Sequence, residues 1–110
     1  MLLSDGIVTI YRQEITSSPG DMPKYEWIPF WRSYFGNKTV GITRYYTAME
    51  HNDQVDLLIE VQRNTKISAA TDRAEIDGIY YRITQVQHLL DDDGLPMTDL
   101  SLERIGALDD

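Results

Sequence analysis

The sequence contains no cysteine, and histidine is nearly as scarce. The absence of cysteine excludes disulfide frameworks, thiolate zinc sites and cysteine nucleophiles. His51 and His88 stand far apart, without the H-x-H or H-x-x-x-H spacing that brings two imidazoles to one metal ion. We therefore expect no metal site and no cofactor.

Long apolar runs are also missing. No stretch approaches the roughly 20 apolar residues of a membrane-spanning helix. The opening MLLSDGIVTIYRQ lacks the basic segment and long apolar run of a signal peptide. These features predict a soluble protein without membrane contact that stays where it is made. Its 110 residues, 42% of them apolar, predict one folded domain over residues 1–110.

Basic residues are few: the chain has 10 Lys and Arg and 18 Asp and Glu, which gives a formal net charge of -8. Such a chain repels the phosphate backbone, which disfavours sequence-specific binding of DNA or RNA. The same charge suits a surface past which DNA moves without sticking. It also suits the simpler role of keeping the protein soluble, and the number alone does not separate the two.

Motifs for catalysis are absent. The seven glycines are scattered singly rather than in a phosphate-binding pattern, and no G-x-S-x-G elbow occurs. The run Asp91–Gly94 invites a calcium interpretation. However, an EF-hand placed on Gly94 would put Leu89 and Leu100 at ligand positions, and neither can bind calcium. We interpret the run as a turn, and expect no catalytic residues and no enzymatic activity.

The residues that are present favour β-structure. Apolar and β-branched residues alternate over 6–15, 54–64 and 97–105, which is typical of strands with one buried face. In residues 54–64, Val55, Leu57, Ile59 and Val61 fall on one side of the expected strand, and Asp56, Leu58, Glu60 and Gln62 fall on the other. A further strand over 24–35 contains Pro29, which cannot donate to a ladder, so we expect an edge position or a bulge at Ile28–Pro29.

A β-hairpin is predicted over Arg73–Ile83. Its two-residue Asp77–Gly78 loop favours a type I′ turn, because both positions need positive φ. This register places Tyr81 and Ile83 on the core face with Ala74, Ile76 and Ile79. Beyond Ile83 the alternation slips, and a bulge near Thr84–Gln85 would return Val86 to the inside.

These elements predict an all-β fold: a small closed or nearly closed antiparallel β-barrel or sandwich of about six strands. One long loop, Gly36–Asp53, is inserted between two strands, and Thr47–Glu50 matches a capping box with which a short helix can begin. Residues 106–110 form a flexible tail. Long loops of this kind are often functional, and the basic and aromatic residues Lys38, Arg44, Tyr45 and Tyr46 suit contacts with a partner protein.

Six aromatic residues fall within Tyr25–Phe35. They can form a base-stacking platform like that of OB-type barrels, or they can serve core packing and a protein interface. No basic groove accompanies them in the sequence, so stacking on nucleic acid is the weaker interpretation.

The order of these features resembles the head-tail joining proteins of tailed bacteriophages, the head-closure, stopper or adaptor components. The strand VTIYRQE, the tryptophan-bearing YEWIPFWRSYFG, a polar excursion, a strand ending IEVQRN and the final LSLERI follow in that order. The most specific match is the pattern D-G-x-x-Y-x-I-x-x-V, carried by Asp77, Gly78, Tyr81, Ile83 and Val86, and Arg63 fits as well. Trp31-Arg32 stands where the family often has Trp-Ala, and this departure leaves the packing of that strand open.

The resemblance implies a structural protein of the virion, assembled in the bacterial host cytoplasm. Its copies would form a ring between the portal or adaptor and the tail, which closes the head, retains packaged DNA and receives the tail. DNA would pass through or be plugged without sequence-specific binding. The ring-assembly loop would carry Lys38, Thr39, Val40, Arg44, Tyr45 and Tyr46. The alternatives are a tail-terminator or tail-completion protein and, from another class, an OB-like binder of single-stranded nucleic acid.

Overall fold

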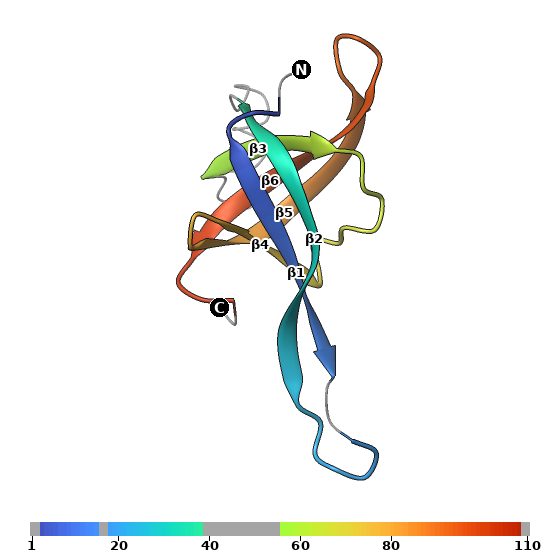
Figure 1. Ribbon diagram of the computed structural model, residues 1–110, viewed down its shortest axis with the longest axis vertical. Helices are drawn as coiled ribbons and strands as arrows, with labels where there is room; N and C mark the ends of the chain where they lie inside the picture. Colours follow the sequence, from blue (N-terminus) through green and yellow to red (C-terminus); the bar gives the residue numbers. More distant parts are fainter. Residues whose placement is uncertain (1–2, 16–17, 39–55, 109–110) are drawn as a thin grey trace, which may run out of the picture.

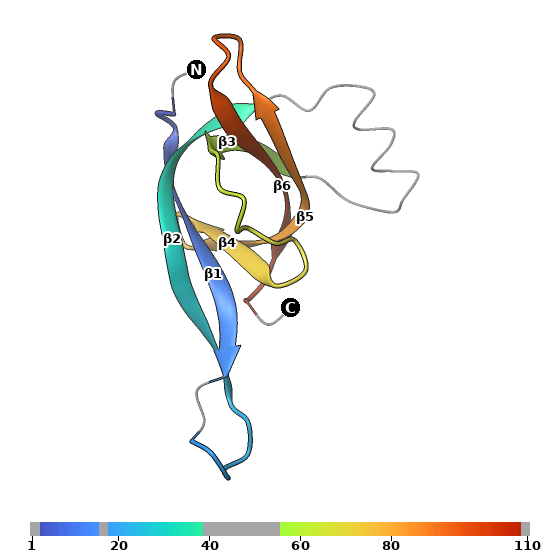
Figure 2. The same ribbon diagram turned by 90° about the vertical axis from the view of Figure 1, so that its right-hand side faces the viewer.

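The computed structural model describes residues 3–15, 18–38 and 56–108, and within them every regular element is a β-strand. Six antiparallel strands close into a barrel in the order β1-β2-β3-β6-β5-β4 (Figures 1 and 2). The expected all-β barrel of about six strands is therefore confirmed. The strands are β1 (Gly6–Ile15), β2 (Tyr25–Lys38), β3 (Leu57–Gln62), β4 (Asp72–Ile76), β5 (Ile79–Leu90) and β6 (Pro96–Ile105).

The barrel interior is filled by aliphatic side chains from β1, β3, β4, β5 and β6, together with Phe35 of β2. Ile67, which lies in the connection between β3 and β4, also reaches this core and is 6% exposed. Burial of these side chains is the main driving force for closing the sheet. The buried cluster consists of Val8, Ile10, Phe35, Ile59, Val61, Ile67, Ala74, Ile76, Ile83, Leu100 and Leu102.

The β4–β5 hairpin has the predicted register. Ile76 pairs with Ile79 and Ala74 with Tyr81, while Asp77 and Gly78 have φ of 53° and 81°. Positive φ at both loop positions is what a type I′ turn requires. The Glu75 carboxylate accepts a hydrogen bond from the Gly78 amide at 2.6 Å, which fixes the turn further. Tyr81 packs against the core and Ile83 is buried in it, so this hairpin is scaffold.

Two bulges let the long strands curve around the barrel. Opposite the Ile10/Tyr11 step, the β1–β2 pairing passes from Trp31 to Pro29 and leaves Phe30 as the extra residue. The β5–β6 register shifts between Ile83 and Gln85, which brings Val86 to the core. The second irregularity lies where the slip in the apolar alternation predicts it, and the first falls at Phe30, directly after the predicted position Ile28–Pro29.

The β1–β2 ribbon is longer than the barrel. β4 pairs with β1 only over Thr9–Arg12, whereas β1 and β2 stay paired as far as Ile15 and Tyr25. This end of the ribbon projects from the closed part of the molecule (Figures 1 and 2). We call Gln13–Ile15, Tyr25–Trp27 and the described residues 18–24 between them the arm.

One expectation needs correction. The inserted loop does not begin at Gly36, because Gly36, Asn37 and Lys38 continue β2 and pair with Glu60, Ile59 and Leu58 of β3. The strand β3 is buried on both faces, since Leu58 and Glu60 on its second side are 3% and 1% exposed. The rest of the predicted loop, with the short helix at Thr47, lies outside the described residues. β6 ends at Ile105, where the predicted tail begins.

Candidate protein-interaction surface

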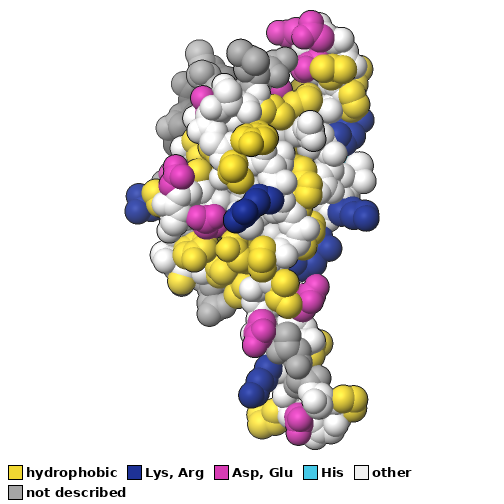
Figure 3. All heavy atoms as spheres, in the orientation of Figure 1, with side chains coloured by type: hydrophobic (Ala, Val, Ile, Leu, Met, Phe, Trp, Pro, Cys, Tyr) yellow, Lys and Arg dark blue, Asp and Glu magenta, His cyan; other side chains and the backbone are white. Residues whose placement is uncertain are grey.

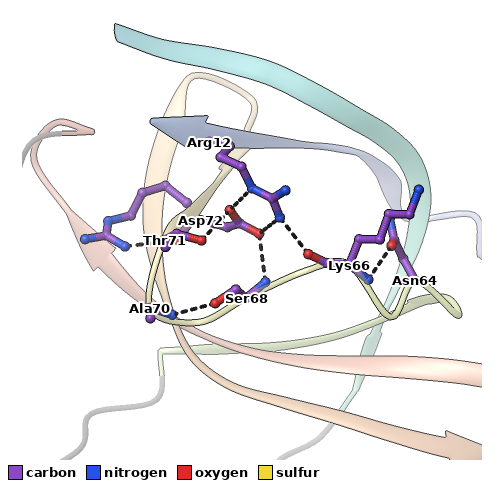
Figure 4. A network of polar contacts seen from close by, with 8 residues as sticks. Arg12, Asn64, Lys66, Ser68, Ala70, Thr71 and Asp72 are labelled. Carbon is purple, nitrogen blue, oxygen red and sulfur yellow. Dashed lines mark hydrogen bonds and ion pairs between the residues drawn. The ribbon is translucent and has the colours of Figure 1, made fainter. Parts of the chain in front are cut away.

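A buried ion pair holds the base of the arm. Asp72 at the start of β4 is fully buried, and its carboxylate accepts hydrogen bonds from Arg12 Nε at 2.8 Å and Nη2 at 2.9 Å. It also accepts the Ser68 amide at 2.7 Å and the Thr71 hydroxyl at 3.1 Å (Figure 4). The two-pronged pairing of guanidinium with carboxylate has a fixed geometry, so it sets the direction of β1 where it leaves the barrel.

Arg12 also joins the arm to the connection between β3 and β4. Its Nη2 donates to the Lys66 carbonyl at 2.6 Å, and its guanidinium lies 4.2 Å from the centre of the Phe30 ring (Figure 4 shows the polar contacts). The hydrogen bond to Asp72 raises the pKa of Arg12 against the opposing effect of burial. The cation therefore remains charged at any pH at which the protein is handled.

The two faces of the arm differ in chemistry. Gln13 pairs with Trp27 and Ile15 with Tyr25, so these four side chains share one face. Glu14 and Glu26 pair on the opposite face, where two like charges stand directly across from each other. The arm also exposes large apolar side chains: Ile15 is 63%, Met22 84% and Tyr25 59% exposed.

A groove lies between the start of β4 and the face of the arm that carries Gln13, Ile15, Tyr25 and Trp27. Its volume is about 520 Å³. One wall is formed by polar, aliphatic and aromatic side chains of the arm, and the other by the two residues before β4 and by Arg73 within it. Arg73 is the only charged side chain among the described residues that line it. The lining residues are Gln13, Ile15, Tyr25, Trp27, Ala70, Thr71 and Arg73.

Arg73 is a poorly solvated cation in this groove. Its guanidinium lies 5.4 Å from the centre of the Trp27 ring, and Nη1 donates to the Asp72 carbonyl at 3.0 Å. Its Nε is buried and has no hydrogen-bond partner among the described residues. Burial lowers the pKa of Arg73, Arg82 on the paired strand lowers it further, and Asp72 opposes both. The groove thus offers a cation whose charge is incompletely balanced beside an apolar wall.

Lys38 takes a structural position rather than the predicted place in a partner loop. Its Nζ lies 3.1 Å from Glu60 and 2.9 Å from Asp99, which face each other on β3 and β6. Burial alone would lower the pKa of Lys38, but hydrogen bonds to Asp99 and Glu60 outweigh it and raise the pKa. Because both carboxylates are buried, Lys38 neutralises charge that the sheet could not otherwise hold.

The other predicted site residues fall into two groups. Thr39, Val40, Arg44, Tyr45 and Tyr46 lie outside the described residues, so their assignment stays a prediction. The hairpin residues Asp77 and Gly78 form the exposed turn described above, and Tyr81 and Ile83 belong to the scaffold.

The aromatic residues of β2 do not form one platform. Phe30 and Trp31 pack against the core and Phe35 belongs to it, whereas Tyr25 and Tyr34 are exposed. Sequence reasoning missed the arm and its groove. The one hint in the sequence is that Ile15 and Tyr25 end the two strands that flank the Pro-Gly turn, and this pair does not mark where the arm leaves the barrel.

Among residues 3–15, 18–38 and 56–108, no three His, Asp or Glu side chains are grouped as a metal site would require. The same residues include no helix of the length and apolar character needed to cross a membrane. No protein-family model matches the sequence, and no curated protein matches it either.

Proposed function

We propose that this protein is a structural connector of a tailed phage or prophage. Copies of it form a ring between the portal or adaptor and the tail. The ring closes the head, retains the packaged DNA and provides the surface on which the tail docks. The protein works by assembly rather than catalysis, and it resides in the virion after assembly in the bacterial cytoplasm.

The observation that carries this proposal is the arm. A closed barrel has no need of a ribbon that extends past its own core, and the ribbon's exposed Ile15, Met22 and Tyr25 contribute nothing to the buried cluster. Apolar side chains gathered on a projection are typical of a protein-binding element. The resemblance of the D-G-x-x-Y-x-I-x-x-V pattern to head-tail joining proteins supplies the setting.

The loop predicted to contact a partner remains part of the proposal, although Lys38 belongs to β2 and not to that loop. Arg44, Tyr45 and Tyr46 combine a cation with aromatic rings, the composition that protein interfaces favour. The net charge of -8 has a role in the same assembly, because a channel with few phosphate-binding cations lets DNA move with little drag.

The exposed arm supports a tail-terminator or tail-completion role equally well, since such proteins also assemble in rings. The position of the gene separates the two: a connector gene lies between the capsid genes and the tail-tube genes. An OB-like single-strand binder has less support, because few aromatics of β2 are exposed. It predicts salt-sensitive oligonucleotide binding at about 50 mM salt, and a flat titration there would exclude it.

Retention of DNA tests the connector role. Purified protein is added to DNA-filled, tailless heads that carry the portal, and DNA released from the heads is digested with nuclease. We expect the protein to protect the packaged DNA. A variant with Met22→Ser and Tyr25→Ser should lose this effect, whereas Tyr34→Ser, at a side chain 64% exposed on the barrel, should keep it. Unchanged leakage with the unaltered protein contradicts the proposal.

A further inference from the structure

The groove at the base of the arm selects a particular kind of ligand. Its walls join the apolar and aromatic side chains of Ile15, Tyr25 and Trp27 to the polar Gln13 and Thr71, and Arg73 supplies one partly desolvated positive charge. A segment that joins a carboxylate to aliphatic side chains satisfies both features. The volume of the groove, about 520 Å³, lies within the range of about 300–1,000 Å³ that is usual for binding sites.

The opposite end of the same molecule carries such a segment. The turn between β5 and β6 contains Asp91, Asp92 and Asp93, and the leucines on either side are exposed, Leu90 by 61% and Leu95 by 56%. Figure 3 shows acidic side chains at this tip with hydrophobic side chains next to them. We call residues 90–95 the acidic tip.

The acidic tip is held in one shape before any contact is made. The Asp91 carboxylate accepts hydrogen bonds from the backbone amides of Asp93, at 2.9 Å, and Leu95, at 2.8 Å. The Asp91 amide in turn donates a hydrogen bond to the Leu95 carbonyl at 2.9 Å. Because the turn is fixed by these bonds, little conformational entropy is lost when it enters a groove. Asp92 is left exposed at the end of the turn.

We propose that the groove of one copy receives the acidic tip of a second copy. The exposed leucines cover Ile15 and Trp27, and a tip carboxylate approaches Arg73. The choice of a second copy follows from charge: in a chain of net charge -8, Arg73 is the one charged side chain among the described residues that line the groove, and every charged residue of the tip is acidic.

The contact is head to tail. In Figures 1 and 2 the arm and the β5–β6 turn lie at opposite ends of the molecule, so one chain cannot place its own tip in its own groove. A contact between two different surfaces leaves one of each free, and repetition produces a ring when the rotation closes. The inference thus deepens the connector proposal and rests on it for ring closure.

The absence of cysteine allows a direct test with full-length chains. One batch carries Gln13→Cys in the groove and another carries Asp93→Cys at the tip; both positions are exposed, and the exposed Asp92 remains. The two are mixed and oxidised, and mass spectrometry measures the mixed disulfide. The matched control mixes Asp93→Cys with Tyr34→Cys, an exposed position on the barrel.

We expect about tenfold more mixed disulfide for the groove and tip pair than for the control, a preference of about 1.4 kcal/mol. Salt at about 0.5 M should reduce this excess, because it screens the attraction between the tip and Arg73. Adding Arg73→Gln to the groove chain should lower the yield in the same way. If that variant fails to fold, the salt dependence still tests the charge pairing.

Equal yields for the two mixtures overturn the inference. This failure can be told apart from failure of the connector role. If the protein protects DNA in the heads but the groove and tip pair cross-links no better than the control, then another partner fills the groove. A strong cross-link with no effect on the heads leaves the contact standing and refutes the connector.

Discussion

Replacing Asp72 by alanine removes the acceptor that organises the base of the arm. Four donors then lose this acceptor: two nitrogens of Arg12, the Ser68 amide and the Thr71 hydroxyl, of which Arg12 Nη2 keeps its bond to the Lys66 carbonyl. Removing one member of a buried ion pair costs about 3–5 kcal/mol, because the other charge stays partly buried. The Arg12 side chain is 33% exposed, so water recovers part of that loss. We therefore expect the free energy of unfolding to fall by about 3 kcal/mol.

Thermal unfolding followed by circular dichroism measures the effect. At about 4–6 °C for each kcal/mol in a domain of this size, the midpoint should fall by about 12–18 °C. Urea unfolding read from the fluorescence of Trp27 and Trp31 gives the free energy itself. Asp92→Ala is the matched control, because it removes an exposed carboxylate, and its midpoint should stay within about 2 °C of the parent.

A double-mutant cycle identifies the interaction responsible. Arg12→Ala and Asp72→Ala together should cost less than the sum of the two single changes, with a coupling energy above about 1 kcal/mol. If Asp72→Ala changes stability by less than about 1 kcal/mol, or if the two changes simply add, then the pair does not hold the arm and the reasoning is refuted.

Three further outcomes are expected. Gly78→Val should lower the free energy of unfolding by about 1 kcal/mol or more, whereas Gly78→Asn should cost less; no atom lies within 4 Å of an added Cβ, so the loss comes from positive φ alone. Because the pKa of Lys38 is raised on folding, the stability difference between the parent and Lys38→Met should be constant at neutral pH and shrink above about pH 10.5; a constant difference through pH 12 contradicts this. Backbone hydrogen bonds from Leu95 and Asp93 lower the pKa of Asp91 against burial, so protection of the Leu95 amide from hydrogen exchange should persist above about pH 4 and decline in stronger acid. Asp91→Ala should lack that protection at every pH.

Much of the barrel could be predicted because its signals are local. The Asp77–Gly78 loop determines the register of its hairpin by itself. The break in the apolar alternation after Ile83 indicates a bulge whichever strand lies beside it. The bounds of β1 follow from its own run of strand-forming residues, Gly6–Ile15. Each of these features depends on a few consecutive residues.

The errors concern contacts between distant parts of the chain. Gly36, Asn37 and Lys38 have little strand propensity, and they join β2 because β3 offers them a partner. Alternation places Glu60 on the face opposite Ile59 and Val61, and Lys38 of β2 together with the neighbouring strand β6 encloses it there. The burial of β3 on both faces could not be foreseen without that pairing.

The arm was missed for a similar reason. Its existence depends on where β4 stops pairing with β1, at Arg12, and no residue of the β1–β2 ribbon marks that point. The groove combines this arm with Ala70 and Thr71, which lie more than forty residues further along the chain. Local patterns describe each wall of the groove but do not bring the walls together.

The connector role is tested most directly by electron microscopy of DNA-filled, tailless heads that carry the portal, imaged with and without the purified protein. We expect a ring of added density on the portal axis. This density should be lost with Met22→Ser and Tyr25→Ser and retained with Tyr34→Ser. A portal that stays bare in the presence of folded protein would contradict the connector role.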